Sequence, residues 1–86
     1  MSFLSENVIP GNHGKVFGTD ATKHKDLVRI KNKILTVKGV NDVIIDEEIF
    51  PKEFTVYTKA LVKVKDIEDA VIFTGFHVIS QDLLKL

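Results

Sequence analysis

The apolar positions in the middle of the chain recur every three or four residues, which is the spacing of one face of a helix. The residues on this stripe are Leu27, Ile30, Ile34 and Val37. The opposite face is polar and basic. The spacing predicts a helix over residues 23–38, with Thr22 as its N-cap and Gly39 directly after its end.

Before this helix, Val16 and Phe17 indicate a short strand, and after it apolar and polar residues alternate with a period of two, which predicts further strands. We expect strands over residues 15–20, 40–46 and 54–58. An acidic turn containing a proline joins the second of these to the third as a hairpin. Residues 59–64 keep the alternation, so they fit either a longer third strand or a loop with buried anchors.

The last third of the chain predicts a short helix over residues 66–74, ended by Gly75, and a strand over residues 76–80. The element order is therefore βαββαβ, and the expected fold class is α+β, ferredoxin-like. Right-handed crossovers place two helices on one face of a four-stranded antiparallel sheet. Three connections then share one end of the sheet, and they bring together His24, Asp26, the Glu47–Glu48 turn and His77.

A chain of 86 residues is expected to form one domain. We assign residues 15–80 to this domain, residues 1–14 to an N-terminal arm with turn-forming residues, and residues 81–86 to a C-terminal tail. The apolar runs are too short to span a bilayer, and the first residues have no signal-peptide pattern. With no cysteine, the chain has no disulfide, thiolate ligand or cysteine nucleophile. We expect a cytoplasmic protein that does not bind membranes.

The charges balance, with 12 basic and 12 acidic residues, which argues against a nucleic-acid partner. Phe54, Tyr57 and Phe76 are aromatic residues of the type that ferredoxin-like sheets stack on RNA bases, but the sequence has no RNP-type motif. The distribution of charge is uneven. The first helix and its loop are basic, whereas the hairpin and the second helix are acidic. Such a dipolar surface favours docking to a complementary protein or to a second copy of the chain, although a solvated charge pattern without a partner explains it equally well.

Two glycine pairs and one strand occur at a specific spacing: Gly39-Val40, the strand Val43-Ile44-Ile45-Asp46, and Gly75-Phe76. In this respect residues 15–80 resemble the heavy-metal-associated domain of copper chaperones and metal-pumping ATPases. In that family a Gly-Met-Thr-Cys-x-x-Cys loop opens the first helix and binds soft metals through two thiolates. The resemblance places Met-Thr at Ala21-Thr22 and the two cysteines at Lys23 and Asp26. A lysine repels a metal cation and a carboxylate is a hard ligand, so the soft-metal function does not carry over.

The remaining candidates for binding lie at the same end of the domain. Two imidazoles and a carboxylate, from His24, His77 and Asp26, would suit Zn(II), Ni(II) or Cu(II). Lys23 and Lys25, beside the free N–H groups of a helix start, would accept an anionic group of a partner, although long lysines in water are the simpler explanation.

Catalytic motifs are absent from the sequence: it has no Ser-His-Asp order, no phosphate-binding glycine loop and no HExxH helix. We therefore expect a non-catalytic binding module without a cofactor. It would dock a protein partner through the loop formed by Thr22, Lys23, His24, Lys25 and Asp26. The alternative is a divalent transition metal held by His24, Asp26 and His77.

Overall fold

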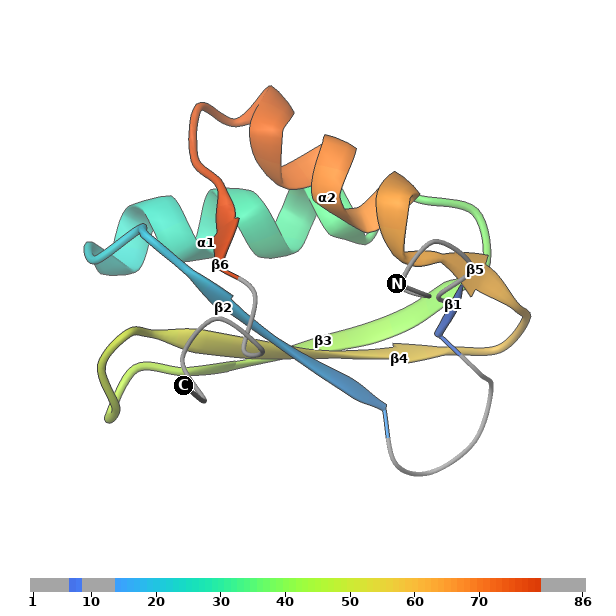
Figure 1. Ribbon diagram of the computed structural model, residues 1–86, viewed down its shortest axis with the longest axis horizontal. Coiled ribbons are helices and arrows are strands. Elements are labelled where there is room, and N and C mark those ends of the chain that lie inside the picture. Colours follow the sequence, from blue (N-terminus) through green and yellow to red (C-terminus); the bar gives the residue numbers. More distant parts are fainter. Residues whose placement is uncertain (1–6, 9–13, 80–86) are drawn as a thin grey trace.

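The computed structural model describes residues 7–8 and 14–79, and it forms an α+β domain (Figure 1). Four strands make an antiparallel sheet in the order β3-β4-β2-β6, and helices α1 and α2 lie together over one face. This is the ferredoxin-like arrangement that was predicted from the order of helix-like and strand-like spacing of apolar residues along the chain. The elements are β1 (Asn7–Val8), β2 (Lys15–Thr19), α1 (His24–Ile34), β3 (Val40–Asp46), β4 (Glu53–Thr58), β5 (Val62–Lys63), α2 (Val64–Phe73) and β6 (Val78–Ile79).

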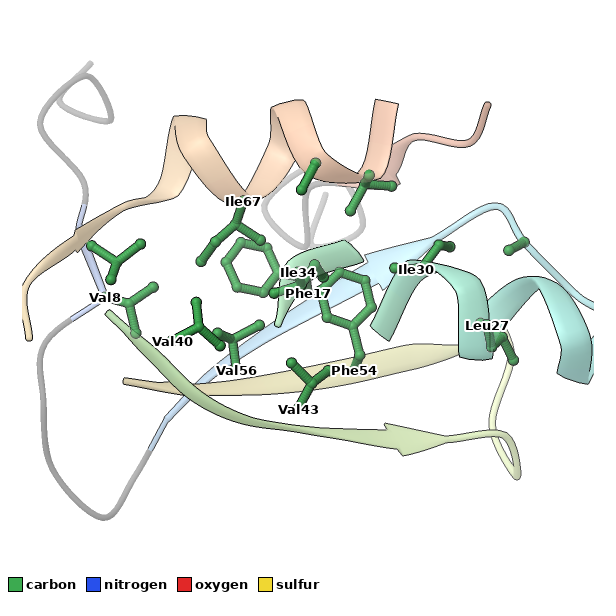
Figure 2. Packing of buried hydrophobic residues seen from close by; sticks show 14 residues of the cluster. Val8, Phe17, Leu27, Ile30, Ile34, Val40, Val43, Phe54, Val56 and Ile67 are labelled. Atoms are coloured by element: carbon green, nitrogen blue, oxygen red, sulfur yellow. The ribbon is translucent and has the colours of Figure 1, made fainter. Parts of the chain in front are cut away.

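The core lies between the sheet and the two helices (Figure 2). Its centre is a pair of stacked rings, Phe17 on β2 and Phe54 on β4, which face each other across the strand pair with centroids 5.4 Å apart. The predicted helical stripe belongs to the same core, where Leu27, Ile30 and Ile34 are all at most 1% exposed. The alternating positions of the strands and the helical stripe therefore meet in one core.

A second, two-stranded sheet pairs β1 with β5. It settles the ambiguity over residues 59–64: β4 ends at Thr58, and Val62 begins a separate short strand. Val8 and Val62 lie opposite each other in this pair, and both are almost completely buried. The turn-forming residues 10–13 and the tail 81–86 lie outside the described residues.

Helix α1 is shorter than its apolar stripe predicts, because it ends at Ile34 instead of residue 38. After Ile34 the chain tightens: the N–H of Val37 donates to Ile34 O at 2.9 Å, and Thr36 Oγ1 donates to Lys33 O at 2.6 Å. Val37 still packs against the core from this turn. The apolar spacing therefore extends beyond the end of the helix. The tight turn after Ile34 partly buries Val37, the last apolar residue of the stripe.

The first residue of α1 also differs from the prediction. The N-cap is Lys23, which has extended backbone angles and no capping side chain, so the expected cap at Thr22 is wrong. The N–H groups of Asp26 and Leu27 both donate to Lys23 O. Thr22 lies one residue too early for its hydroxyl to reach the first free N–H groups of the helix.

The two helix-following glycines have different roles. Gly75 has a φ of 97° and comes directly after the C-cap Thr74, as predicted. Gly39 has a φ of 96° but lies five residues beyond Ile34, where it begins the approach to β3. The final strand is also shorter than predicted: β6 starts at Val78 instead of residue 76.

These two glycines provide a matched test of the packing. Both have a positive φ, which costs an alanine about 1–2 kcal/mol. A Cβ on Gly39 would lie 2.7 Å from Val62 Cγ2, whereas a Cβ on Gly75 would meet no atom within 4 Å. Gly39→Ala should therefore lower the free energy of unfolding by about 1–3 kcal/mol more than Gly75→Ala. Urea denaturation of both variants measures this difference, and equal losses would contradict the packing of β5 against Gly39.

Candidate functional site

The loop before α1 is anchored at both ends and exposed between them. Ala21 is fully buried on one side and Leu27 is 1% exposed on the other. The side chains between these anchors that face solvent are Thr22, Lys23, His24 and Lys25. The predicted interaction loop is therefore a short exposed segment whose two ends are fixed to the core.

Asp26, the last residue of the predicted loop, turns away from solvent. Its side chain is 15% exposed, and Oδ1 lies 3.5 Å from Arg29 Nη1, one turn further along α1. A carboxylate in the first turn also interacts favourably with the helix dipole. Asp26 thus supports the start of the helix instead of facing a ligand.

His24 connects the loop to the hairpin between β3 and β4. Its Nδ1 lies 2.6 Å from Glu47 Oε2. The two side chains are 73% and 37% exposed, and exposed pairs of this kind contribute only about 0.2–1 kcal/mol. The contact therefore positions the hairpin beside the helix start more than it stabilises the fold. It also means that a carboxylate of the chain itself already lies close to the N-terminus of α1.

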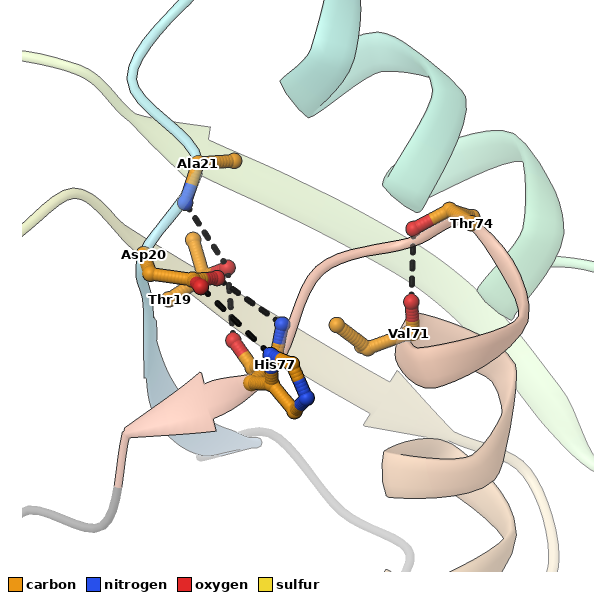
Figure 3. A network of polar contacts seen from close by, with 6 residues as sticks. All are labelled: Thr19, Asp20, Ala21, Val71, Thr74 and His77. Carbon is orange, nitrogen blue, oxygen red and sulfur yellow. Dashed lines mark hydrogen bonds and ion pairs between the residues drawn. The ribbon is translucent and has the colours of Figure 1, made fainter.

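A network of hydrogen bonds joins the end of β2 to the residue before β6 (Figure 3). Thr19 Oγ1 donates to His77 O at 2.9 Å and accepts the N–H of Ala21 at 3.3 Å. The N–H of His77 donates to Asp20 Oδ1 at 2.8 Å, and His77 Nδ1 lies 3.5 Å from Asp20 Oδ2. This network fixes the loop in place. The central role of Thr19 was not predicted, because a threonine at a strand end is an ordinary strand residue in sequence.

The three candidate metal ligands have separate partners. His24 contacts Glu47, Asp26 contacts Arg29, and His77 contacts Asp20. Among the described residues, no group of three or more His, Asp or Glu side chains is arranged to hold a metal ion. The contact of His24 with Glu47 confirms the predicted proximity of the loop to the hairpin, and His77 contacts Asp20, two residues before the loop. The proposed ligand set stays a prediction without geometric support.

The aromatic residues considered for RNA stacking largely face the core. Phe54 is 1% exposed and stacked on Phe17, and Phe76 is partly buried against the core cluster. Tyr57 alternates with Phe54 along β4, so it lies on the opposite face of the sheet, half-buried. At least two of the three rings are therefore unavailable for a stack of bases on the open sheet face.

Comparison of the chain with protein families, with curated proteins and with solved structures finds no match in any of the three. Neither α1 nor α2, the two helices of the described residues, is long and apolar enough to cross a membrane. The chain is thus a small α+β domain of βαββαβ order without cysteine.

Two threonines test the importance of the network in Figure 3. Thr19→Val removes both hydrogen bonds of the hydroxyl and should lower the free energy of unfolding by about 1–3 kcal/mol. Thr58 is also buried, but its Oγ1 has no hydrogen-bond partner within the described part of the chain. Thr58→Val should therefore be neutral or stabilising by about 1 kcal/mol, because it removes an unpaired buried hydroxyl. Urea denaturation checks both, and equal effects would contradict a specific role for Thr19.

The separate pairing of the candidate ligands predicts the result of a metal titration. Adding Zn(II), Ni(II) or Cu(II) to the chain should produce no saturable change in the amide spectrum around residues 20–26 and 75–78. A site of three ligands would need His24 to leave Glu47 and His77 to leave Asp20. Saturable shifts confined to those two segments, and lost in a His24→Ala variant, would instead establish the metal site.

Proposed function

We propose that this chain is a non-catalytic binding module that docks a protein partner through the loop of residues 22–26. The observation that supports this proposal most is that the charged side chains of Lys23 and Lys25 are available to a partner. Both side chains are exposed, and within residues 7–8 and 14–79 neither ammonium group has a carboxylate partner. Two unpaired cations on a loop anchored by the core form a preorganised contact for a carboxylate-bearing surface.

Charge beyond the loop supports an acidic partner. The exposed Arg29 continues the basic surface along α1, whereas exposed acids lie on the hairpin and on α2. Opposite charges across a contact raise the rate of encounter and reject partners of the wrong sign. We therefore propose an acidic surface patch as the feature of the partner that this loop recognises. We place this activity in the cytoplasm, an expectation that comes from the sequence alone.

We further propose that the domain shares its origin with the heavy-metal-associated domain. The βαββαβ order, Gly75-Phe76 after α2, and the loop between the first strand of the sheet and α1 support this. Lys23 and Asp26 occupy the positions of the two cysteines in that resemblance. A loop of this composition offers a partner charge and backbone groups in place of thiolates.

Charge reversal of the loop tests the docking proposal. The full chain is used as bait in the cells that produce it, as wild type and as the double variant Lys23→Glu, Lys25→Glu. A genuine partner should lose at least about tenfold in affinity, since each side chain changes from attraction to repulsion. Calorimetry with the purified partner then measures the loss directly.

Lys59→Glu, Lys63→Glu is the matched control. It changes the net charge equally, and both lysines are exposed near the sheet end opposite the hairpin tip. This control should retain the partner. The proposal is wrong if both double variants retain the same proteins, or if both lose them equally.

A further inference from the structure

The hairpin between β3 and β4 ends in an exposed apolar tip with acidic neighbours. Phe50 is 85% exposed, and Ile49 beside it is 39% exposed. Glu47 is engaged by His24, but the exposed carboxylate of Glu48 has no ion-pair partner in the described part of the chain. The tip thus presents an aromatic ring and an unpaired negative charge two residues apart.

A shallow groove of about 340 Å³ lies where α1 passes the end of α2. Its lining carries two cations and no acid: Arg29, Asn32, Lys33, Thr36, Phe73 and Thr74. Phe73 is 75% exposed, and Lys33 Nζ lies 3.9 Å from the centre of its ring. Arg29 is partly neutralised by Asp26, so Lys33 is the cation of the groove without a carboxylate partner among the described residues.

The tip and the groove are complementary in their exposed aromatic rings and in their charges. Each has one strongly exposed phenylalanine, Phe50 on the tip and Phe73 in the groove. Glu48 and Lys33 also carry charges of opposite sign, and neither has an ion-pair partner among the described residues. An aromatic pair together with a charge pair is the combination that typically anchors a small protein contact.

The tip cannot fill the groove of its own molecule. Glu47 is held beside His24, the first residue of α1. Lys33 lies nine residues further along the helix, about 13 Å at 1.5 Å per residue. The hairpin strands are fixed in the sheet, and the two helices form the other layer (Figure 1). The groove belongs to this second layer, where α1 passes the end of α2. A hairpin tip that enters this groove must therefore come from another molecule.

We infer that the groove receives the hairpin tip of a second copy of this chain, with Phe50 against Phe73 and Glu48 beside Lys33. The balanced net charge removes the general repulsion that would oppose such self-association. The contact is small compared with a standard interface, so its dissociation constant is expected at roughly 0.1–1 mM. It uses neither Lys23 nor Lys25, and it is independent of the docking loop proposed above.

A dilution series from about 1 mM to about 20 µM spans the expected affinity. Amide resonances of residues 48–50 and of the groove residues should shift together with concentration. Sedimentation velocity should show the average mass rising over the same range. Resonances that do not change with concentration, or that change only elsewhere, would overturn the inference.

Single variants then separate the two halves of the contact. Phe50→Ser and Lys33→Glu should each weaken self-association at least about fivefold, and thermal unfolding verifies that each variant is folded. Lys31→Glu is the charge-matched control, because Lys31 lies in the same last turn of α1 but does not line the groove. Self-association weakened equally by Lys31→Glu would overturn the inference.

A charge exchange provides the positive test. Glu48→Lys alone should weaken self-association, and the double variant Lys33→Glu, Glu48→Lys should recover most of the loss. Recovery requires that these two residues meet between molecules. A double variant as weak as the worse single variant would overturn their pairing.

Discussion

The stacking of Phe17 on Phe54 is the contact on which the rest of this domain depends. These rings belong to β2 and β4, the two inner strands of the sheet, and they lie beneath the helical layer. Because β2 also pairs with β6, the position of Phe17 in the core determines where the last strand joins the sheet. Phe17 lies two residues before Thr19, the last residue of β2, after which the exposed loop before α1 begins.

The periodicity of the apolar residues predicted most of this arrangement, because each element buries its own face in the same core. The periodicity gave the wrong element bounds where an apolar side chain is buried by a turn or by a different strand instead of the predicted helix or strand. Val37 continues the stripe of α1 but packs from a turn, so the helix end was placed four residues too late. Residues 59–64 alternate like a strand, but their partner is β1, and nothing in the local pattern identifies a strand partner more than fifty residues away.

The sequence predicted which chain segments lie close together at the candidate site more accurately than it predicted which side chains there form a ligand set. Topology alone places the loop, the hairpin and residue 77 at one end of the sheet, and contacts between them are present. Which side chains pair there depends on rotamers and on distances of a few ångströms, and sequence spacing does not contain that information. The structure pairs each candidate ligand with a different neighbour, which leaves Lys23 and Lys25 as the loop charges without an ion-pair partner in the described part of the chain.

The network at residue 77 has a consequence for how this chain can change over evolutionary time. Its hydrogen bonds of 2.8 and 2.9 Å use the backbone N–H and carbonyl of His77, while the imidazole is 3.5 Å from Asp20 and largely exposed. Thr19 and Asp20 therefore recognise a main-chain position and not a histidine. Related chains should conserve the threonine and the aspartate, while position 77 should accept any residue except proline, which lacks the N–H that Asp20 accepts. A histidine found there is then no sign of an ancestral ligand.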